Sequence, residues 1–521
     1  MIRIRDLTLP VGADENALRK KAGKLLGVPV LSLKIRKKSV DARKKPDIRL
    51  IYTVDVSVSG DEEAFLRRAA DPKITAAPTD CYAPPAPAAV PEDRPVIVGF
   101  GPAGMFAALV LAEAGLRPIV LERGEPVEVR TEKVAHFWQT GALDPGSNVQ
   151  FGEGGAGTFS DGKLNTGVND PRIAWILHRF VQAGADPAIE WDAKPHIGTD
   201  TLRTVVRNLR QEIQTAGGEI RFGTQMTALR TENGAVTGVV TQSGEEIPCR
   251  SVILAIGHSA RDTVAMLHEM GIPMEPKPFS MGVRIEHPQT LVDRAQYGST
   301  DLPLPAADYK LNVRLPDGGS AYTFCMCPGG YVVAAASEAG GVVTNGMSDH
   351  ARDGENANSA LLVTLRPEDF PYPGALGGMI WQRELEQRAF EMGGRNYHAP
   401  AQTVGDFLGK PAAPALTPTY RPGVTWCDLH GVLPPILTNV MEQALPALGR
   451  KLKGFDDPGA VMTAPETRSS SPVRIVRGEN LQSALTGLYP CGEGAGYAGG
   501  ITSAAIDGIR CAEAILKGAE T

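Results

Sequence analysis

Cysteine and long apolar runs are both scarce in this chain. Seven cysteines in 521 residues, an odd number, indicate free thiols in a reducing compartment. The most apolar stretch, residues 96–121, is interrupted by glycines, prolines and two charged residues. Because a membrane helix needs about 20 mostly apolar residues, this stretch is expected to form a buried strand and helix. The residues after Met1 do not form a secretory signal, so we expect a cytoplasmic protein that makes no membrane contact.

The chain also has no large excess of one charge. Its formal net charge is −6, with 42% hydrophobic and 21% charged residues. This composition is typical of soluble globular enzymes and argues against disorder. A chain of this length is too long for one ordinary core, so we expect two or three domains.

Residues 1–75 predict a separate basic module. The first 70 residues hold 16 lysines and arginines against 9 aspartates and glutamates, although the whole chain is negative. The apolar spacing predicts strand, helix, strand, strand and helix, which is a small βαββα module. Residues 76–94, rich in proline and alanine, then predict a linker with little capacity to pack.

Two basic clusters stand out in this module, at residues 36–38 and 43–45. Such clusters could dock a protein partner, although they are more often solvated turns. No aromatic residues are interleaved with them, so nucleic-acid binding is not expected.

From residue 95 onwards the pattern is that of an α/β protein. Residues 95–272 alternate apolar strands with helices, and residues 446–521 end in a further strand and helix. Residues 273–445 are rich in proline, glycine and short β-like runs. We therefore predict a discontinuous α/β domain interrupted by a β-rich substrate or cap domain.

A glycine turn after the first strand of this region predicts a dinucleotide site. Gly99 permits the tight turn, Gly101 lets the backbone approach a pyrophosphate, and Gly104 lets the helix pack closely on the sheet. The start of that helix offers free N–H groups and a partial positive charge to phosphates. Glu122 ends the next strand, where a carboxylate can accept hydrogen bonds from ribose hydroxyls.

The glycine spacing alone is not specific, because the chain contains it three times. The glycines at 152, 154 and 157 match it, as do those at 494, 496 and 499. Neither of these segments follows an apolar strand and leads to a second strand that ends in an acid. Only the turn at residues 99–104 has the context of a dinucleotide site.

Later segments favour FAD over NAD. Residues 96–122 resemble the two-dinucleotide-binding-domain flavoproteins, in which this Rossmann-like unit holds the ADP half of FAD. Residues 252–257 and 487–493 resemble the strands that return the chain to that domain, and residues 499–501 open a helix that would face the flavin. The resemblance implies FAD contacts from Gly99, Gly101, Ala103, Gly104, Glu122, Arg123, Gly155, Gly157, Asn165, Met226, Gly257, Gly492, Glu493, Gly500 and Ile501.

Four further segments narrow the resemblance to one family. Residues 25–29, 151–165, 324–330 and 465–472 are all similar to the uncharacterised bacterial FAD-dependent dehydrogenase family. Its members carry a basic module before the flavin domain, and the similarity covers essentially the whole chain. The family implies FAD as the cofactor and an oxidoreductase reaction, but it names no substrate.

Lys163 and Arg468 are the candidate catalytic residues. Lys163 lies in the glycine-rich loop 152–165, and it or Asp161 could sit near the flavin or the substrate. Arg468 could bind a substrate carboxylate, or it could pair with Glu466 and hold a loop in place. His258 and His287 are possible acids or bases, although a lone histidine is more often structural.

Cys325 and Cys327 are expected to be buried small apolar residues, and a redox-active pair is the alternative. In a strand, residues two apart have Cα atoms about 6.5–7 Å apart, near the upper limit for a disulfide, so a bridge between them would be strained. No further ligands stand nearby at suitable spacing, and we expect no metal site.

These patterns together predict an FAD-dependent oxidoreductase that transfers a hydride between FAD and a small organic substrate. The chain has no second complete nicotinamide unit, so NAD(P)H is a candidate transient co-substrate. One alternative is a flavin monooxygenase, which would incorporate oxygen at the expense of NAD(P)H. The other is a non-catalytic redox sensor, in which the flavin-bound chain recruits a partner.

Overall fold

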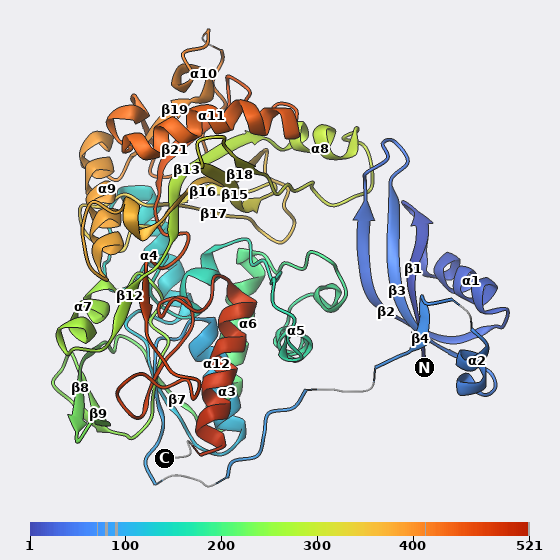
Figure 1. Ribbon diagram of the computed structural model, residues 1–521, viewed down its shortest axis with the longest axis horizontal. Coiled ribbons are helices and arrows are strands. Elements are labelled where there is room, and N and C mark those ends of the chain that lie inside the picture. Colours follow the sequence, from blue (N-terminus) through green and yellow to red (C-terminus); the bar gives the residue numbers. More distant parts are fainter. Residues whose placement is uncertain (70, 79–81, 89–91, 412, 519–521) are drawn as a thin grey trace.

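The computed structural model describes residues 1–69, 71–78, 82–88, 92–411 and 413–518 (Figure 1). Two stacked lobes form the main body, and a small module lies beside them. Within the described residues, no helix is both long enough and apolar enough to cross a membrane.

A five-stranded sheet forms the centre of the lower lobe in Figure 1. All of its neighbouring strands are parallel. Its order is β23 (Leu488–Pro490), β11 (Val252–Leu254), β5 (Val96–Val98), β6 (Ile119–Leu121) and β7 (Glu219–Arg221). Four of the five strands are completely buried, and only the edge strand β7 is partly exposed. Short parallel strands buried on both faces are typical of a doubly wound α/β sheet. The α/β fold class predicted from the sequence is therefore correct.

Each face of this sheet is covered by a different layer. Ile97 packs with the helices, whereas Val96 and Val98 pack on the other face against an antiparallel three-stranded sheet. The helices of the first layer are α3 (Pro102–Glu113), α5 (Arg172–Gln182), α6 (Thr199–Thr215) and α12 (Ile501–Leu516). The three-stranded sheet consists of β8 (Met226–Glu232), β9 (Ala235–Thr241) and β10 (Glu246–Pro248).

A seven-stranded sheet forms the upper lobe. Its order is β14 (Asn312–Arg314), β15 (Ser320–Cys327), β18 (Asn356–Leu365), β13 (Phe279–Pro288), β21 (Val461–Glu466), β19 (Ala399–Thr403) and β20 (Val424–Trp426). Helices α9 (Gly377–Gly393) and α11 (Pro435–Lys451) contribute side chains to the same apolar core. The boundary expected at residue 445 falls inside α11, and β21 still belongs to this sheet, so the upper lobe extends further along the chain than predicted.

Shorter elements complete the two lobes. Antiparallel pairs form between β12 (Met274–Pro276) and β22 (Val473–Ile475), and between β16 (Tyr331–Ala334) and β17 (Thr344–Met347). The remaining helices are α4 (Val127–Thr140), α7 (Arg261–Glu269), α8 (Gln289–Tyr297) and α10 (Val404–Phe407).

The N-terminal module has one strand more than the sequence predicted. Its elements are β1 (Ile2–Pro10), α1 (Glu15–Leu26), β2 (Val30–Asp41), β3 (Arg49–Val58), α2 (Glu62–Arg68) and β4 (Ile74–Ala76). They form an antiparallel sheet of order β2–β3–β1–β4, which is the split βαβ arrangement of ferredoxin-like folds. β4 was missed because only three residues pair, at the start of the proline-rich segment.

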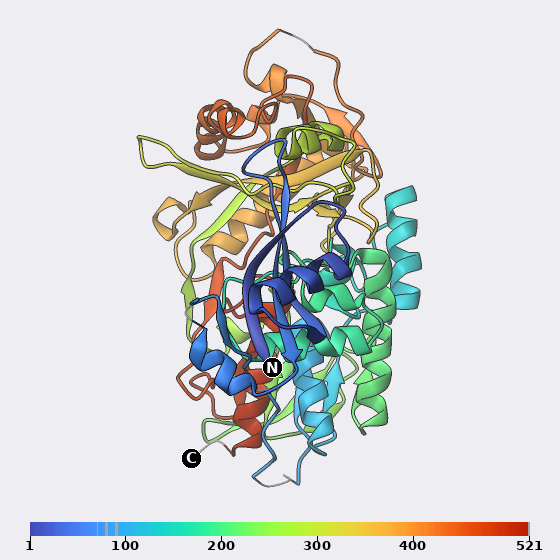
Figure 2. The same cartoon turned by 90° about the vertical axis from the view of Figure 1, so that its right-hand side faces the viewer.

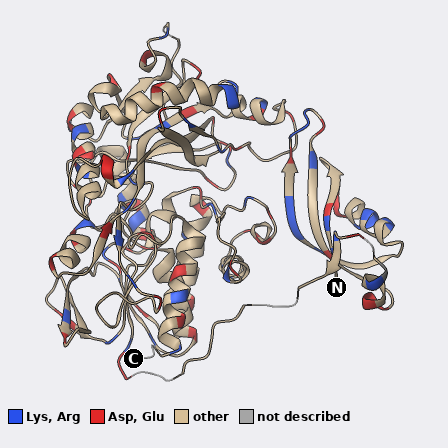
Figure 3. Cartoon of the chain, viewed as in Figure 1, with Lys and Arg blue, Asp and Glu red and all other residues tan. Residues whose placement is uncertain are grey.

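The module lies with its sheet toward the main body and its helices on the far side (Figures 1 and 2). Contact is made through the main chain of Lys38, whose N–H donates to the Trp191 carbonyl over 2.8 Å and whose carbonyl accepts from the Ala193 N–H over 2.9 Å. Basic residues line β2 (Figure 3), and the Lys38 ammonium lies 5.4 Å from the centre of the Trp191 ring.

The linker packs more than its composition predicted. The Tyr82 hydroxyl donates to Glu513 of α12 over 2.6 Å, and its ring lies edge-on to Trp175 of α5 at 5.9 Å. The Ala88 N–H donates to the Leu516 carbonyl over 2.8 Å. An aromatic residue among prolines and alanines thus attaches this segment to the helical layer.

Candidate active site

The glycine turn after β5 is shaped by close backbone contacts. Gly99 has a φ of +97°, and a Cβ there would lie 2.4 Å from the Ala255 carbonyl oxygen. A Cβ on Gly104 would lie 2.0 Å from the Gly99 oxygen. At Gly101, by contrast, a Cβ would meet only the Gly155 Cα, at 3.7 Å. The fold itself therefore requires Gly99 and Gly104, whereas the bare backbone of Gly101 faces an open cavity.

That cavity has a volume of about 510 Å³, which is within the usual range for cofactor and ligand sites. Of the predicted cofactor contacts and the two candidate catalytic residues, all except Gly104 line it. Those that do are Gly99, Gly101, Ala103, Glu122, Arg123, Gly155, Gly157, Lys163, Asn165, Met226, Gly257, Arg468, Gly492, Glu493, Gly500 and Ile501. Gly104 instead lets α3 approach the strand behind the turn.

Glu122 holds the turn in place through hydrogen bonds to the protein backbone. One carboxylate oxygen accepts the Phe100 N–H over 2.8 Å, and the other accepts the N–H groups of Gly124 and Gly152, each over 2.9 Å. Since a carboxylate has about four lone-pair sites, roughly one remains for a ribose hydroxyl. The sequence had predicted that Glu122 could accept hydrogen bonds from both hydroxyls.

A buried arginine organises the glycine-rich loop. The Arg130 guanidinium, on α4, donates to the backbone carbonyls of Asn148, Glu153, Val149 and Gly155, and the longest of these bonds is 2.9 Å. Burial lowers the pKa of Arg130 to about 10. Sequence reasoning missed this residue because its partners are carbonyls, which leave no pattern of acidic side chains.

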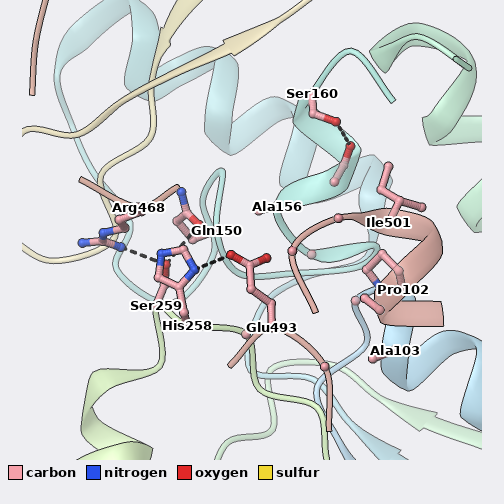
Figure 4. Close-up of a pocket in the computed structure, with 18 of the residues that line it drawn as sticks. Pro102, Ala103, Gln150, Ala156, Ser160, His258, Ser259, Arg468, Glu493 and Ile501 are labelled. Atoms are coloured by element: carbon pink, nitrogen blue, oxygen red, sulfur yellow. Dashed lines mark hydrogen bonds and ion pairs between the residues drawn. The ribbon is translucent and has the colours of Figure 1, made fainter. Parts of the chain in front are cut away.

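The C-terminal part of the chain supplies the opposite wall (Figure 4). Glu493 accepts a hydrogen bond from His258 Nδ1 over 2.7 Å, so the predicted cofactor contact is paired with one of the candidate histidines. Gly500 caps α12, whose first residue, Ile501, lies next to Gly157. The positive end of α12 therefore meets the cavity.

Lys163 lies at the end of the cavity that adjoins the upper lobe. Its ammonium is 2.6 Å from Asp161 and also donates to the Met326 carbonyl. Asp161 is fully buried and is held in addition by Arg352, at 2.5 Å, and by Ser348. These contacts fix the position of a positive charge on the cavity wall.

Arg468 does not have the partner that the sequence predicted. Its guanidinium forms a two-pronged contact with Glu386, at 3.1 and 2.8 Å, and not with Glu466. Its remaining nitrogen donates to Ser259 over 3.0 Å and to Ser337. With every nitrogen engaged, Arg468 is better suited to holding the loop in place than to binding a substrate carboxylate.

Glu466 pairs instead with Arg284 of β13, at 3.2 Å. Both side chains are buried, and burial raises the pKa of Glu466 to about 7 despite this partner. Glu466 lines the cavity, where it can hold or release a proton near neutral pH. Neither this pairing nor Arg284 itself was predicted, because the two residues are distant in sequence and meet only across the sheet.

The remaining candidates divide between the cavity and the core. His287 is buried and bonds the Phe455 carbonyl over 2.8 Å, which is a structural role. Cys327 is buried as expected. Cys325 is only partly buried and lines the cavity, so its expected burial was wrong.

Two family models match separate segments of the chain. Residues 278–469 match the model described as FAD-dependent protein, C-terminal domain-like. Residues 1–57 match a domain of unknown function, DUF8436. The first match covers all seven strands of the upper-lobe sheet.

Two curated proteins are similar to this chain, one over its full length and one over about a third of it. An uncharacterized protein of Clostridium beijerinckii is 46% identical over 529 residues, covering 99% of this chain and 98% of that protein. A probable electron transfer flavoprotein-quinone oxidoreductase of Escherichia coli is 29% identical over 175 residues, covering 31% of this chain and 36% of that protein.

Similarity to solved structures is lower. A geranylgeranyl bacteriochlorophyll reductase-like protein of Thermoplasma acidophilum covers 81% of this chain and 77% of its own, with 13% identity and a TM-score of 0.37. A quinol fumarate reductase of E. coli covers 81% and 70%, with 12% identity and the same TM-score. Neither likeness is close enough to carry an argument about function.

The parallel sheet, the glycine turn and the returning C-terminal strand and helix define the class as a flavoprotein with a Rossmann-like FAD-binding domain. The chain belongs to the same family as the 46% identical Clostridium beijerinckii protein, a family of FAD-dependent proteins, and its cofactor is FAD.

Proposed function

We propose that this protein transfers two electrons between FAD and a small organic substrate held under the seven-stranded sheet. The observation that carries the proposal is one continuous cavity with two chemically different ends. Gly99, Gly101 and Glu122 line one end, whereas Lys163, Cys325 and Glu466 line the other. A dinucleotide end joined to an end with titratable groups is the arrangement that flavin redox chemistry needs.

The walls of the cavity fit an extended cofactor. A Cβ on Gly257, Gly499 or Gly500 would meet no atom within 4 Å, so these positions expose bare backbone to a ligand. The N–H groups at the start of α3 would hold the pyrophosphate, and Glu122 the ribose. The positive end of α12 would stabilise negative charge on the reduced ring. When bound, FAD supplies the two-electron chemistry that the side chains themselves lack.

At the other end, the protein's own groups would orient the substrate and handle a proton. Lys163 keeps a fixed positive charge against Asp161 and would attract an electron-rich substrate atom. Glu466 is the candidate acid or base, because its pKa of about 7 lets it exchange a proton at physiological pH. NAD(P)H would serve as a transient reductant that binds and leaves.

Replacement of Gly101 tests where the cofactor lies. Gly101→Val is expected to give folded but nearly colourless protein, because the new side chain meets little protein and fills the cavity instead. Gly167→Val is the matched control, since Gly167 is exposed, has open space around its Cβ position and does not line the cavity. Flavin content per chain and the thermal unfolding temperature should be measured for both variants.

Retention of stoichiometric FAD by Gly101→Val would refute this placement. The reaction itself is tested by anaerobic mixing of the yellow protein with NADH, NADPH and candidate substrates, followed by flavin bleaching. Substrate-dependent bleaching or reoxidation without oxygen supports the proposal. Turnover that requires oxygen and incorporates it into product would favour the monooxygenase alternative instead.

A further inference from the structure

The backbone at Cys325 departs from an ordinary strand. Cys325 has a φ of +43°, in the left-handed region that non-glycine residues rarely adopt. The pairing of β15 with β18 shifts register between Phe324 and Cys327, which marks a β-bulge. The strand geometry from which the sequence predicted a strained Cys325–Cys327 bridge is therefore absent. Strained backbone beside a cavity is typical of functional sites.

The two cysteines occupy different depths. Cys325 is partly exposed and lines the cavity that also contains Lys163 and Ile501. Cys327 is fully buried, and its sulfur lies 3.2 Å from the Cys325 carbonyl oxygen. Both are free thiols in this structure. One thiol is thus accessible from the cavity, and the second lies immediately behind it.

Positive charge surrounds this pair. Arg284 is fully buried and donates to the Cys325 carbonyl over 2.8 Å, and the Lys163 ammonium donates to the carbonyl of the intervening Met326. Hydrogen bonding with Cys327, followed by the charges of Lys163 and Arg284, lowers the pKa of Cys325 below its usual range. The pKa of Cys327 is raised, first by its interaction with Cys325 and then by burial.

The acids nearby do not cancel these charges. Asp161 is shared between Lys163 and Arg352, and Glu466 is paired with Arg284 and has a pKa of about 7. A thiolate at Cys325 therefore has two cations near it, while the nearby carboxylates are either paired or easily protonated. This is the environment in which cysteines react.

We propose that Cys325 and Cys327 form a redox-active pair that relays electrons between FAD and a thiol or disulfide substrate. This inference rests on the proposed function, because it uses FAD as the electron acceptor. Two S–H bonds break, one S–S bond forms between Cys325 and Cys327, and the two electrons and two protons pass to oxidised FAD. A small dithiol regenerates the pair by thiol–disulfide exchange at Cys325 and leaves as its own disulfide.

Anaerobic reductive titration of the holoprotein with dithionite, starting from the oxidised form, tests the relay. The wild-type protein is expected to take up two electrons per chain more than its FAD alone requires. Cys325→Ser and Cys327→Ser should each lose that extra uptake and keep the flavin. Cys427→Ser is the matched control, since Cys427 is partly buried and lies outside the cavity, and it should behave as wild type.

Mass spectrometry of the wild-type protein provides a second readout, which does not depend on whether the variants fold. Residues 315–352 form one tryptic peptide that contains both cysteines. After oxidation in a glutathione redox buffer, that peptide is expected to lack two hydrogens and to resist alkylation. In the reduced protein at neutral pH, Cys325 should be alkylated roughly tenfold faster than Cys427.

The outcomes separate this inference from the proposed function. Protein that binds FAD but takes up no extra electrons, with both thiols alkylated after oxidation, would overturn the relay and leave the cofactor assignment intact. Colourless wild-type protein would instead overturn the proposed function. Extra uptake that persists in Cys327→Ser would also contradict the pairing.

Discussion

Glu153 is a buried acid in the glycine-rich loop, and its backbone carbonyl accepts a hydrogen bond from Arg130. Its carboxylate accepts the Val127 N–H over 2.7 Å and lies 3.1 Å from Arg210, and its side chain is fully buried. Burial raises the pKa of Glu153 from 4.5 to about 7. The folded chain therefore binds a proton here more tightly than the unfolded chain does.

This shift predicts a pH dependence of stability. Because the folded pKa is the higher one, the stabilising contribution of Glu153 is complete below pH 4.5 and is lost as the pH rises through about 7. Glu153→Gln should remove this decline, which amounts to at most about 3 kcal/mol. The free energy of unfolding, measured by denaturant titration from pH 4.5 to pH 8, checks it.

Glu269→Gln serves as the control, because Glu269 is exposed on the surface. Its pH profile should run parallel to that of the wild type. A Glu153→Gln profile that also runs parallel to the wild type would contradict the prediction that burial of Glu153 causes the loss of stability as the pH rises.

At the scale of elements, the site is assembled where helices and strands begin or end. The cavity meets the start of α3, the start of α12 and the bulge of β15. The linker is attached to the far side of the helical layer by the hydrogen bond from Tyr82 to Glu513. Glu513 also binds Arg172 of α5, at 2.5 Å, so one acid joins three segments.

Removal of the Tyr82 hydroxyl tests whether this hydrogen bond stabilises the protein. Tyr82→Phe is expected to lower the free energy of unfolding by about 1–2 kcal/mol, since it deletes a partly buried hydrogen bond to a charged group. Tyr331→Phe is the control, because the Tyr331 hydroxyl makes no hydrogen bond to any other residue that the structure describes. Equal stability of the two variants would mean that the linker is not held by this contact.

At the scale of the whole molecule, every cavity residue lies at or after position 98. The N-terminal module has its own apolar core, built mainly from its sheet and α1. It meets the main body through the main chain of Lys38, the Lys45 ammonium on the Ala295 carbonyl, and the Leu304 side chain, which packs against the module's core. The module is therefore separable from the cofactor site.

A chain that lacks residues 1–75 is accordingly expected to fold and to keep stoichiometric FAD. Its calorimetric unfolding profile should lose the contribution of the module and keep that of the flavin-binding body. Absorbance of the purified protein and differential scanning calorimetry measure the two properties. Colourless or insoluble protein would show that the module is needed to complete the site.

Much of the site could be predicted because its signals are local in sequence. The turn at Gly99–Gly104, the acid Glu122 and the helix start at Ile501 each follow from a short pattern with one physical explanation. The partners of Arg468 and Glu466 could not be predicted in this way. Each of these side chains had several oppositely charged candidates, and only the folded chain selects among them.

The sequence by itself determined the α/β class and the dinucleotide turn, because these depend on periodicity and on glycines at fixed spacing. The choice of FAD over NAD came from the resemblance of later segments to known flavoproteins. Only the tertiary structure decided how far the upper lobe extends, which groups pair beneath it, and that Cys325 faces the cavity. The physical reason is that burial and charge pairing depend on contacts between distant residues. A bulge in one strand can change the environment of a side chain without leaving a mark in the sequence.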